Sequence, residues 1–137
     1  MGDVAGVRLL LDTHVWLWSL LAPTRLSRSA AESLEDVANE LWLSPVSVWE
    51  TLLLIEKGRV EVSVDPSRWV KSVLQSFPVR DALMSRQIAV LSRSVEVKHQ
   101  DPADRFIAAT AMAYGLTLVT ADQRLLAGAP YEVLTAV

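Results

Sequence analysis

The stretch VRLLLDTHVWLWSLLA, residues 7–22, decides the fold class. Its first part is a short, mostly apolar run that ends at Asp12, and the longer run after it has the length of a helix. A short apolar run bounded by a polar residue is typical of a strand buried on both faces. The stretch therefore predicts a buried strand up to Asp12 and a helix after it.

The same alternation continues along the chain. Further strands are expected at 41–44 and 116–120 and near the C-terminus in YEVLTA, with a short strand or edge piece in VEVSV, residues 60–64. Helices are expected over 30–40, 45–57, from Pro66 onward, over 81–92, and from Pro102 to Gly115. Strands that alternate with helices indicate a parallel sheet covered on both faces. We therefore expect an α/β protein, a three-layer α/β/α fold with a mostly parallel central sheet.

Length and composition narrow the class of protein. A chain of 137 residues that is 51% hydrophobic is expected to form one domain over residues 1–137, with MGDVAG, residues 1–6, as a flexible extension. The absence of cysteine excludes disulfides and zinc-thiolate sites and fits a cytoplasmic location. No apolar stretch has the roughly 20 residues of a membrane helix. A net charge of −3 argues against a protein that coats nucleic acid, and a mean hydropathy of +0.28 favours a homodimer.

Four acidic residues occupy comparable places in this pattern. Asp12 ends the first strand, Asp122 follows the strand at 116–120, Glu50 lies in the helix after the second strand, and Asp104 lies in the first turn of its helix. In open parallel sheets, ligands bind beyond the carboxyl ends of the strands. These acids are therefore the candidate functional residues.

Helix capping is the structural alternative for most of these acids. Asp12 and Asp122 each precede a helical stretch, and Asp101 with Asp104 resembles a capping box. The pair Asp65-Pro66 opens a helix like Asp101-Pro102 but has no second acid three residues after its aspartate. We therefore assign Asp101 mainly to capping and Asp104 to another role.

Glu50 lies more than a turn inside its helix, with Val46, Leu53 and Leu54 as its neighbours on one face. A partly buried glutamate needs a partner, a raised pKa or a cation. A salt bridge to a residue such as Arg105 is the structural alternative here.

Clustering of the four acids would favour a metal site. Two carboxylates about 4 Å apart repel by roughly 4 kcal/mol at an effective dielectric constant of 20, so four together require protons or cations. Oxygen ligands without cysteine or a histidine cluster select a hard ion, Mg²⁺ or Mn²⁺. Such an ion supports hydrolysis of phosphodiester bonds.

Four motifs in order, LLLDTHVWLW, SVWE, DPADRFIAATA and LTLVTAD, resemble a PIN-domain ribonuclease of the VapC-like toxin group. The resemblance implies a metal-dependent endoribonuclease that is usually a homodimer and is inhibited by a cognate antitoxin. Carried over by motif, the metal-binding and catalytic acids would be Asp12, Glu50, Asp104 and Asp122.

The resemblance also implies secondary roles. Thr13 and Thr120 would orient water at the metal, and Arg105 would contact phosphate or pair with Glu50. An RNA substrate would require basic residues near the site, such as Arg25, Arg28, Arg86, Lys98 and Arg105. His99 is a further candidate for phosphate.

Other functions remain open at this point. A receiver domain would need an acidic pair and a late lysine, and a haloacid-dehalogenase-like phosphatase would need an acid where this chain has His14. A non-catalytic PIN-like module that docks a protein or RNA is the remaining alternative. The five tryptophans could stack bases, although core or dimer packing is the more common role.

Overall fold

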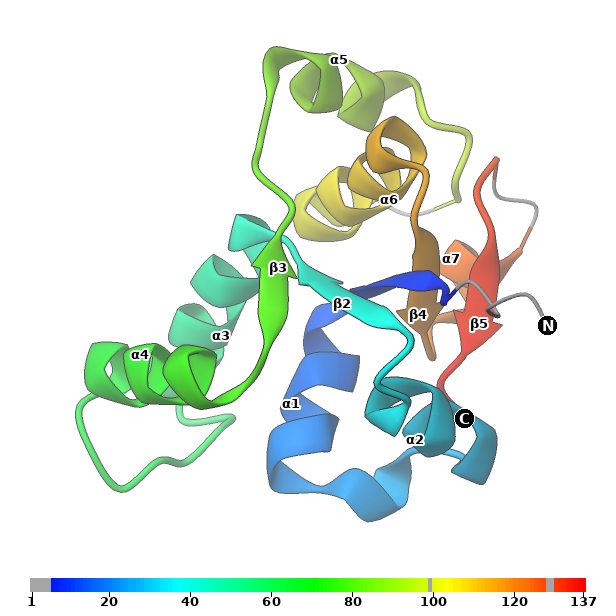
Figure 1. Ribbon diagram of the computed structural model, residues 1–137. Coiled ribbons are helices and arrows are strands. Elements are labelled where there is room, and N and C mark those ends of the chain that lie inside the picture. The colour runs from blue at the N-terminus through cyan, green and yellow to red at the C-terminus, as the bar shows by residue number, and fades with distance from the viewer. Residues whose placement is uncertain (1–5, 99, 128–129) are drawn as a thin grey trace, which may run out of the picture.

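The computed structural model describes residues 6–98, 100–127 and 130–137, and it contains one five-stranded sheet in the order β3-β2-β1-β4-β5 (Figure 1). The strands are β1 (Arg8–Leu11), β2 (Glu40–Leu43), β3 (Val79–Asp81), β4 (Thr117–Thr120) and β5 (Val133–Thr135). Every neighbouring pair is parallel. The prediction of a mostly parallel central sheet is confirmed.

Among the described residues, eight helical segments connect the strands. They are α1 (Thr13–Leu21), η1 (Pro23–Arg25), α2 (Arg28–Glu35), α3 (Pro45–Glu56), α4 (Pro66–Ser76), α5 (Arg86–Ser94), α6 (Pro102–Tyr114) and α7 (Gln123–Leu126). In Figure 1, α5 and α6 lie above the sheet, whereas α1 and α2 lie below it. Within the described residues, no helix is long and apolar enough to cross a membrane.

Strand β1 separates two apolar clusters because its side chains alternate between the two faces of the sheet. Leu9 and Leu11 pack with α1 and α2 in one cluster, which also receives side chains of α3 and α4. Leu10 packs on the other face with residues of α6 such as Ile107 and Ala108. All three leucines are buried, which explains the unbroken apolar run in the sequence and confirms the three-layer arrangement.

Helix termini follow local signals in the sequence. Ser27 caps α2 and Ser44 caps α3 through side-chain oxygens that accept main-chain N–H groups. Gly115 ends α6 in the left-handed region, at φ +65°, where glycine pays no steric penalty. Helix α2 ends at Glu35, short of the predicted residue 40.

Two predictions for the middle of the chain are wrong. Residues 60–64 form no strand, because the main-chain N–H of Val60 donates to the carbonyl of Leu54 at the end of α3 and no strand pairs with this segment. The helix expected from Asp81 begins at Arg86 instead, and Asp81 ends β3, which the sequence did not predict.

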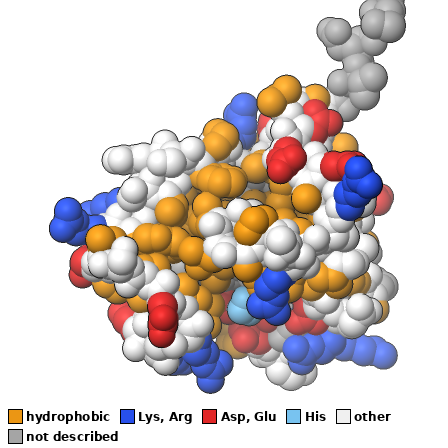
Figure 2. All heavy atoms as spheres, turned by 90° about the horizontal axis from the view of Figure 1, so that it is seen from below, with side chains coloured by type: hydrophobic (Ala, Val, Ile, Leu, Met, Phe, Trp, Pro, Cys, Tyr) orange, Lys and Arg blue, Asp and Glu red, His pale blue; other side chains and the backbone are white. Residues whose placement is uncertain are grey.

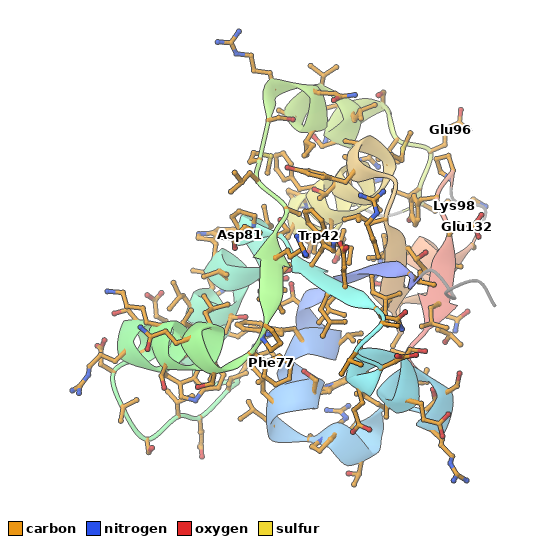
Figure 3. All side chains as sticks on the ribbon, in the orientation of Figure 1. Trp42, Phe77, Asp81, Glu96, Lys98 and Glu132 are labelled. Carbon is orange, nitrogen blue, oxygen red and sulfur yellow. The ribbon has the colours of Figure 1, made fainter. Side chains whose placement is uncertain are left out.

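Side chains of the central strands reach both helical layers. Trp42 of β2 lies toward α6, where its ring is 5.6 Å from that of Tyr114, and Phe77 lies in front of β3 on the opposite face (Figure 3). Asp81 stands at the end of β3, separated from β1 by β2. Gly6 lies directly against the main chain of Ala38. The rest of the predicted extension, residues 1–5, lies outside the described residues.

Candidate active site

The sheet reverses its strand order around β1, because the chain runs from β1 to β2 on one side and returns to β4 on the other. Ligands bind at such a switch point in parallel sheets. Asp12 directly follows β1, and Asp122 follows β4 after one residue. The pairing of Leu11 with Val119 brings these two strand ends together.

Asp12 is held rigidly between the two strands. Its main-chain N–H donates to the carbonyl of Val119 at 3.0 Å, and its Oδ1 accepts from the N–H of Thr13 at 2.8 Å. The carboxylate is 5% exposed. Burial raises the pKa of Asp12, and hydrogen bonds from Thr120 and Thr13 partly offset this effect.

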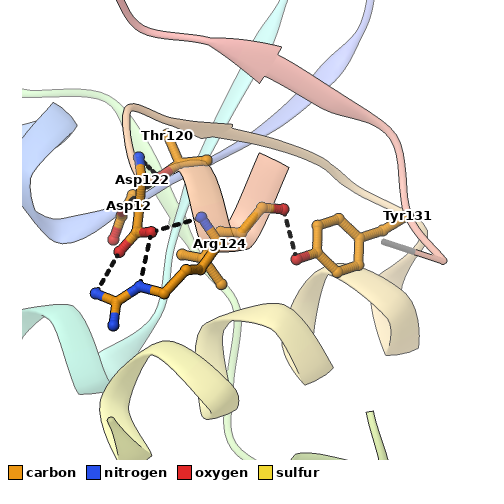
Figure 4. A network of polar contacts seen from close by, with 6 residues as sticks. Asp12, Thr120, Asp122, Arg124 and Tyr131 are labelled. Atoms are coloured by element: carbon orange, nitrogen blue, oxygen red, sulfur yellow. Dashed lines mark hydrogen bonds and ion pairs between the residues drawn. The ribbon is translucent and has the colours of Figure 1, made fainter. Parts of the chain in front are cut away.

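Thr120 connects the acids that follow β1 and β4 (Figure 4). Its Oγ1 donates to Oδ2 of Asp12 at 2.6 Å and accepts from the N–H of Asp122 at 3.0 Å. The hydroxyl is completely buried, so both bonds form away from water. Thr120 therefore orients the carboxylate of Asp12 and fixes the main chain at Asp122.

Asp122 caps the short helix α7 and pairs with Arg124. Its Oδ1 accepts from the N–H of Arg124 at 2.8 Å, and the guanidinium Nε of the same arginine lies 3.4 Å from Oδ1. Figure 4 shows this pair on one side of α7 and Tyr131 on the other. The hydroxyl of Tyr131 donates to the carbonyl of Leu125 and so supports α7 from behind.

Asp104 is a second acid of the cavity whose pKa is raised. It lies half-buried in the first turn of α6. Burial raises the pKa of Asp104 to about 8, and neighbouring negative charges contribute to this rise. These charges come from Asp12, Asp101, Glu50 and Asp122.

The predicted acids line one cavity of about 390 Å³. They come from four places in the fold, namely the end of β1, helix α3, the start of α6 and the segment after β4; they are Asp12, Glu50, Asp101, Asp104 and Asp122. Glu50 reaches the cavity half-buried from the middle of α3. The sequence prediction that these acids lie together is thus matched by the structure, whereas their catalytic role stays a prediction.

The donor set of the cavity fits a hard divalent cation, because it offers carboxylate oxygens and the chain has no cysteine. Within the described residues, however, no three acidic or histidine side chains already converge on a point that could hold an ion. The carboxylate of Asp122 pairs with the guanidinium of Arg124.

Two residues with predicted secondary roles, Thr13 and Asp101, make structural contacts. The Oγ1 of Thr13 donates to the Oγ of Ser47 at 2.9 Å, which joins the beginnings of α1 and α3. Asp101 caps α6 by accepting from the N–H of Ala103, as predicted. The role of Thr13 in orienting water stays a prediction.

Arg105 points toward the loop after α5. Its Nε donates to the carbonyl of Ser92 at 2.7 Å, and its terminal nitrogens donate to the carbonyls of Val97 and Val95 at 3.2 and 3.1 Å. These bonds give Arg105 a clear role in holding the loop before α6. Its proposed contact with phosphate or with Glu50 stays a prediction.

Sequence reasoning did not place four other residues at the cavity, namely His14, Trp18, Ala121 and Arg124. His14 and Trp18 are four residues apart on α1, so a helical projection from Asp12 would have placed them together. Among the basic residues expected near the site, Arg25 lies over the ring of Trp18, and Arg28 pairs with Glu32 on the surface of α2. His99 lies outside the described residues.

Comparison with known proteins agrees with this geometry. The family model described as the PIN domain matches residues 9–129. This chain belongs to the PIN-domain family. Over 118 residues it is 34% identical to Ribonuclease VapC22 of Mycobacterium tuberculosis, an alignment that covers 85% of this chain and 88% of the relative.

Solved structures share the fold of this PIN domain. VapBC2 from Rickettsia felis, bound to a DNA fragment from its promoter, matches with a TM-score of 0.72 and 16% identity over 94% of this chain and 98% of that chain. A toxin-antitoxin complex from Klebsiella pneumoniae matches with a TM-score of 0.63 and 24% identity over 94% and 98%. At these identities the likeness concerns the fold.

Proposed function

We propose that this PIN domain, acting as a single domain over residues 1–137, is a metal-dependent endoribonuclease and the toxin of a toxin-antitoxin pair. The observation that carries the proposal is the set of acids from β1, α3, α6 and the segment after β4 around one cavity. Helix capping does not explain Glu50, because it lies in the middle of α3, whose N-cap is Ser44. The ribonuclease name of the relative from M. tuberculosis supports RNA as the substrate.

Asp12, Glu50, Asp104 and Asp122 would hold Mg²⁺ or Mn²⁺, with Asp101 mainly capping α6. When bound, the cation would neutralise the carboxylates and supply Lewis-acid activation of water and phosphate. The carboxylates would then bind as anions, so the proton that the raised pKa retains on Asp104 at neutral pH would leave. Thr120 keeps Asp12 in place throughout, because its hydroxyl bond is buried.

A cognate antitoxin is the proposed protein partner. The solved complexes that share this fold contain antitoxins, which supports the assignment. The face in Figure 2, seen from the side of α1 and α2, carries a broad apolar area between charged groups. A narrow cleft of about 110 Å³ between α2 and Phe77 is lined mostly by apolar side chains and has room for one apolar side chain of an antitoxin.

A homodimer is proposed for the free toxin. Several large apolar side chains are exposed on α3 and around α5; they are Trp49, Leu83, Met84 and Val90. Exposed apolar groups of this size are typical of surfaces that bind another protein. Sedimentation or light scattering should give twice the mass of one chain, and Val90→Asp should shift the measured mass toward that of the monomer.

Toxin action on RNA would take place in the cytoplasm, where a chain without cysteine is at no disadvantage.

Cleavage of RNA by the purified protein tests the proposal. With Mg²⁺ or Mn²⁺, the wild type should cut a panel of structured and single-stranded RNAs, and chelation should stop the reaction. Asp104→Asn should abolish cleavage without unfolding the protein, whereas Asp65→Asn, a helix cap far from the cavity, should retain it. A folded wild type that binds these RNAs or its antitoxin but cuts none would instead support the non-catalytic binding module.

A further inference from the structure

A group of flat side chains stands at the rim of the acidic cavity. His14 and Trp18 both line the cavity, and their rings stack with centroids 6.3 Å apart and an interplanar angle of 26°. The guanidinium carbon of Arg25 lies 4.5 Å from the centre of the Trp18 ring. The three residues come from α1 and from η1, the turn that follows it.

These side chains are positioned by the fold. Trp18 is half-buried and packs against the apolar cluster beneath the sheet, which fixes its ring. His14 is exposed, and its charge acts on Asp12, so it stands close to the carboxylate at the end of β1. Figure 2 shows a histidine on this face beside both acidic and basic side chains. The rings of His14 and Trp18 therefore form a flat surface beside the part of the cavity that contains Asp12.

The chemistry of the three groups suits an unpaired nucleotide. Every base has a π-face that stacks on an aromatic ring, and such stacking is a common means of binding single-stranded nucleic acid. The guanidinium of Arg25 uses its face on Trp18, which leaves the N–H groups around its edge able to donate to a phosphate. An apolar peptide segment would gain little from the exposed imidazole and guanidinium, so these groups favour RNA.

We propose that His14, Trp18 and Arg25 form a base platform, which stacks an unpaired base of single-stranded RNA next to the phosphodiester at the acidic cavity. This inference rests on the ribonuclease activity proposed above and adds the residues that hold a base of the substrate beside the cavity. The base platform makes the enzyme prefer unpaired over duplex RNA around the cleavage site, because a paired base cannot leave its stack to reach Trp18. It binds the substrate and takes no part in the bond cleavage.

The experiment uses a short single-stranded RNA with one mapped cleavage site. A second version carries an abasic nucleotide on either side of the cleaved bond. Trp18→Leu removes the flat ring but keeps apolar packing, and Trp18→Phe restores a ring. Trp69→Leu is the matched control, since Trp69 is half-buried on α4, packs against the same apolar cluster as Trp18 and does not line the cavity. Thermal unfolding of each variant confirms that it is folded.

The wild type should show a KM about 5- to 150-fold higher for one abasic RNA than for the intact RNA, with little change in kcat. Trp18→Leu should raise the KM for the intact RNA by a similar factor, and the two changes should not add, because they remove the same contact. Trp18→Phe should recover most of the loss. His14→Ala, at an exposed position, should raise KM in the same direction without loss of stability.

Equal KM values for intact and abasic RNAs, or an additive loss with Trp18→Leu, would overturn the base platform while leaving the ribonuclease assignment intact. Weakened antitoxin binding by Trp18→Leu, with unchanged RNA kinetics, would mark the group as part of a protein interface and would also overturn it. Binding of the same RNAs to Asp104→Asn, followed by fluorescence anisotropy, separates the two proposals. Weaker binding of the abasic RNA than of the intact RNA to Asp104→Asn would support the base platform even if no cleavage is found.

Discussion

The buried hydroxyl of Thr120 donates a 2.6 Å hydrogen bond to Oδ2 of Asp12, although the two residues are 108 positions apart in the chain. The same oxygen accepts the N–H of Asp122. One side chain at the end of β4 therefore sets the positions of both acids that follow the two central strands. The arrangement of the cavity depends on this bond as much as on the acids themselves.

Thr120→Val should destabilise the protein by about 1–3 kcal/mol, because it leaves a buried carboxylate oxygen and a main-chain N–H without their partner at nearly constant side-chain volume. It should also lower the rate of RNA cleavage, whereas Thr120→Ser should retain much of both properties. Urea unfolding and cleavage rates give the two measurements. Thr110→Val is the control, because that hydroxyl bonds only to the carbonyl of Phe106 within α6. Equal effects at both threonines would contradict the role given to Thr120.

Asp104 should make the metal-free protein less stable as pH rises. Its pKa is about 8 in the folded protein and 3.8 as a model value, so between these limits the folded state binds the extra proton. Stability contributed by this proton is present below about pH 4 and is lost as pH rises through about 8. Asp104→Asn should therefore gain stability relative to the wild type from pH 5 to pH 8 in EDTA, as measured by urea unfolding.

Asp65→Asn is a control whose stability relative to the wild type should change with pH in the opposite direction. Hydrogen bonds from Ser67 and the N–H of Arg68 lower the pKa of Asp65, so its carboxylate favours the folded state once it is ionised. The loss of stability in Asp65→Asn should be present at pH 5 and above and shrink as the pH falls through the folded pKa. If the stability of Asp104→Asn changed with pH in the same direction as that of Asp65→Asn, the raised pKa of Asp104 would be refuted.

Adding Mg²⁺ or Mn²⁺ should reverse the order of stability between wild type and Asp104→Asn at pH 8. A cation that binds only the folded state stabilises it by about 2.7 kcal/mol at one hundred times its dissociation constant. The carboxylates that repel each other without a cation become its ligands. Thermal unfolding against cation concentration measures the effect, and an unchanged melting temperature in the wild type would contradict the metal site.

The α/β/α layering was predictable from the sequence because it depends on local composition. Leu9, Leu10 and Leu11 are all buried, so the strand reads as an apolar run whatever its partners are. The nearness of Asp12 and Asp122 was predictable for a different reason, because the carboxyl ends of parallel strands meet at one edge of the sheet. Strand β3 was not predictable, because it has three residues and depends on pairing with β2.

The base platform and the role of Arg105 depend on contacts that no short pattern contains. Arg105 donates to main-chain carbonyls, which every residue has, so the sequence gives no signal for its partners. Arg25 reaches Trp18 only because the chain turns at η1. The alternation in residues 60–64 suggested a strand, but Val60 packs against the apolar cluster from a loop after α3 and Val64 is exposed.

Arg105→Gln should destabilise the protein by about 2–3 kcal/mol, because hydrogen bonds from a charged group to the carbonyl of Ser92 in α5 and to two carbonyls of the loop after α5 would be lost. Arg93→Gln, at an exposed position of α5, should change stability by less than about 0.5 kcal/mol. Urea unfolding measures both, and hydrogen exchange should increase in residues 93–98 of Arg105→Gln. Unchanged stability of Arg105→Gln together with slower RNA cleavage would instead favour a contact between Arg105 and phosphate.

Asp101 should influence cleavage through Asp104. Asp101→Asn keeps an oxygen that can cap α6, so it should cost less stability than Asp101→Ala, whose expected loss is about 0.5–2 kcal/mol. Both variants remove a negative charge that raises the pKa of Asp104. Asp104 would then lose its proton at lower pH, and the rising limb of the cleavage rate against pH should shift to lower values. A loss of activity in Asp101→Asn as complete as in Asp104→Asn, without a shift of the pH profile, would assign Asp101 to the metal instead of the helix cap.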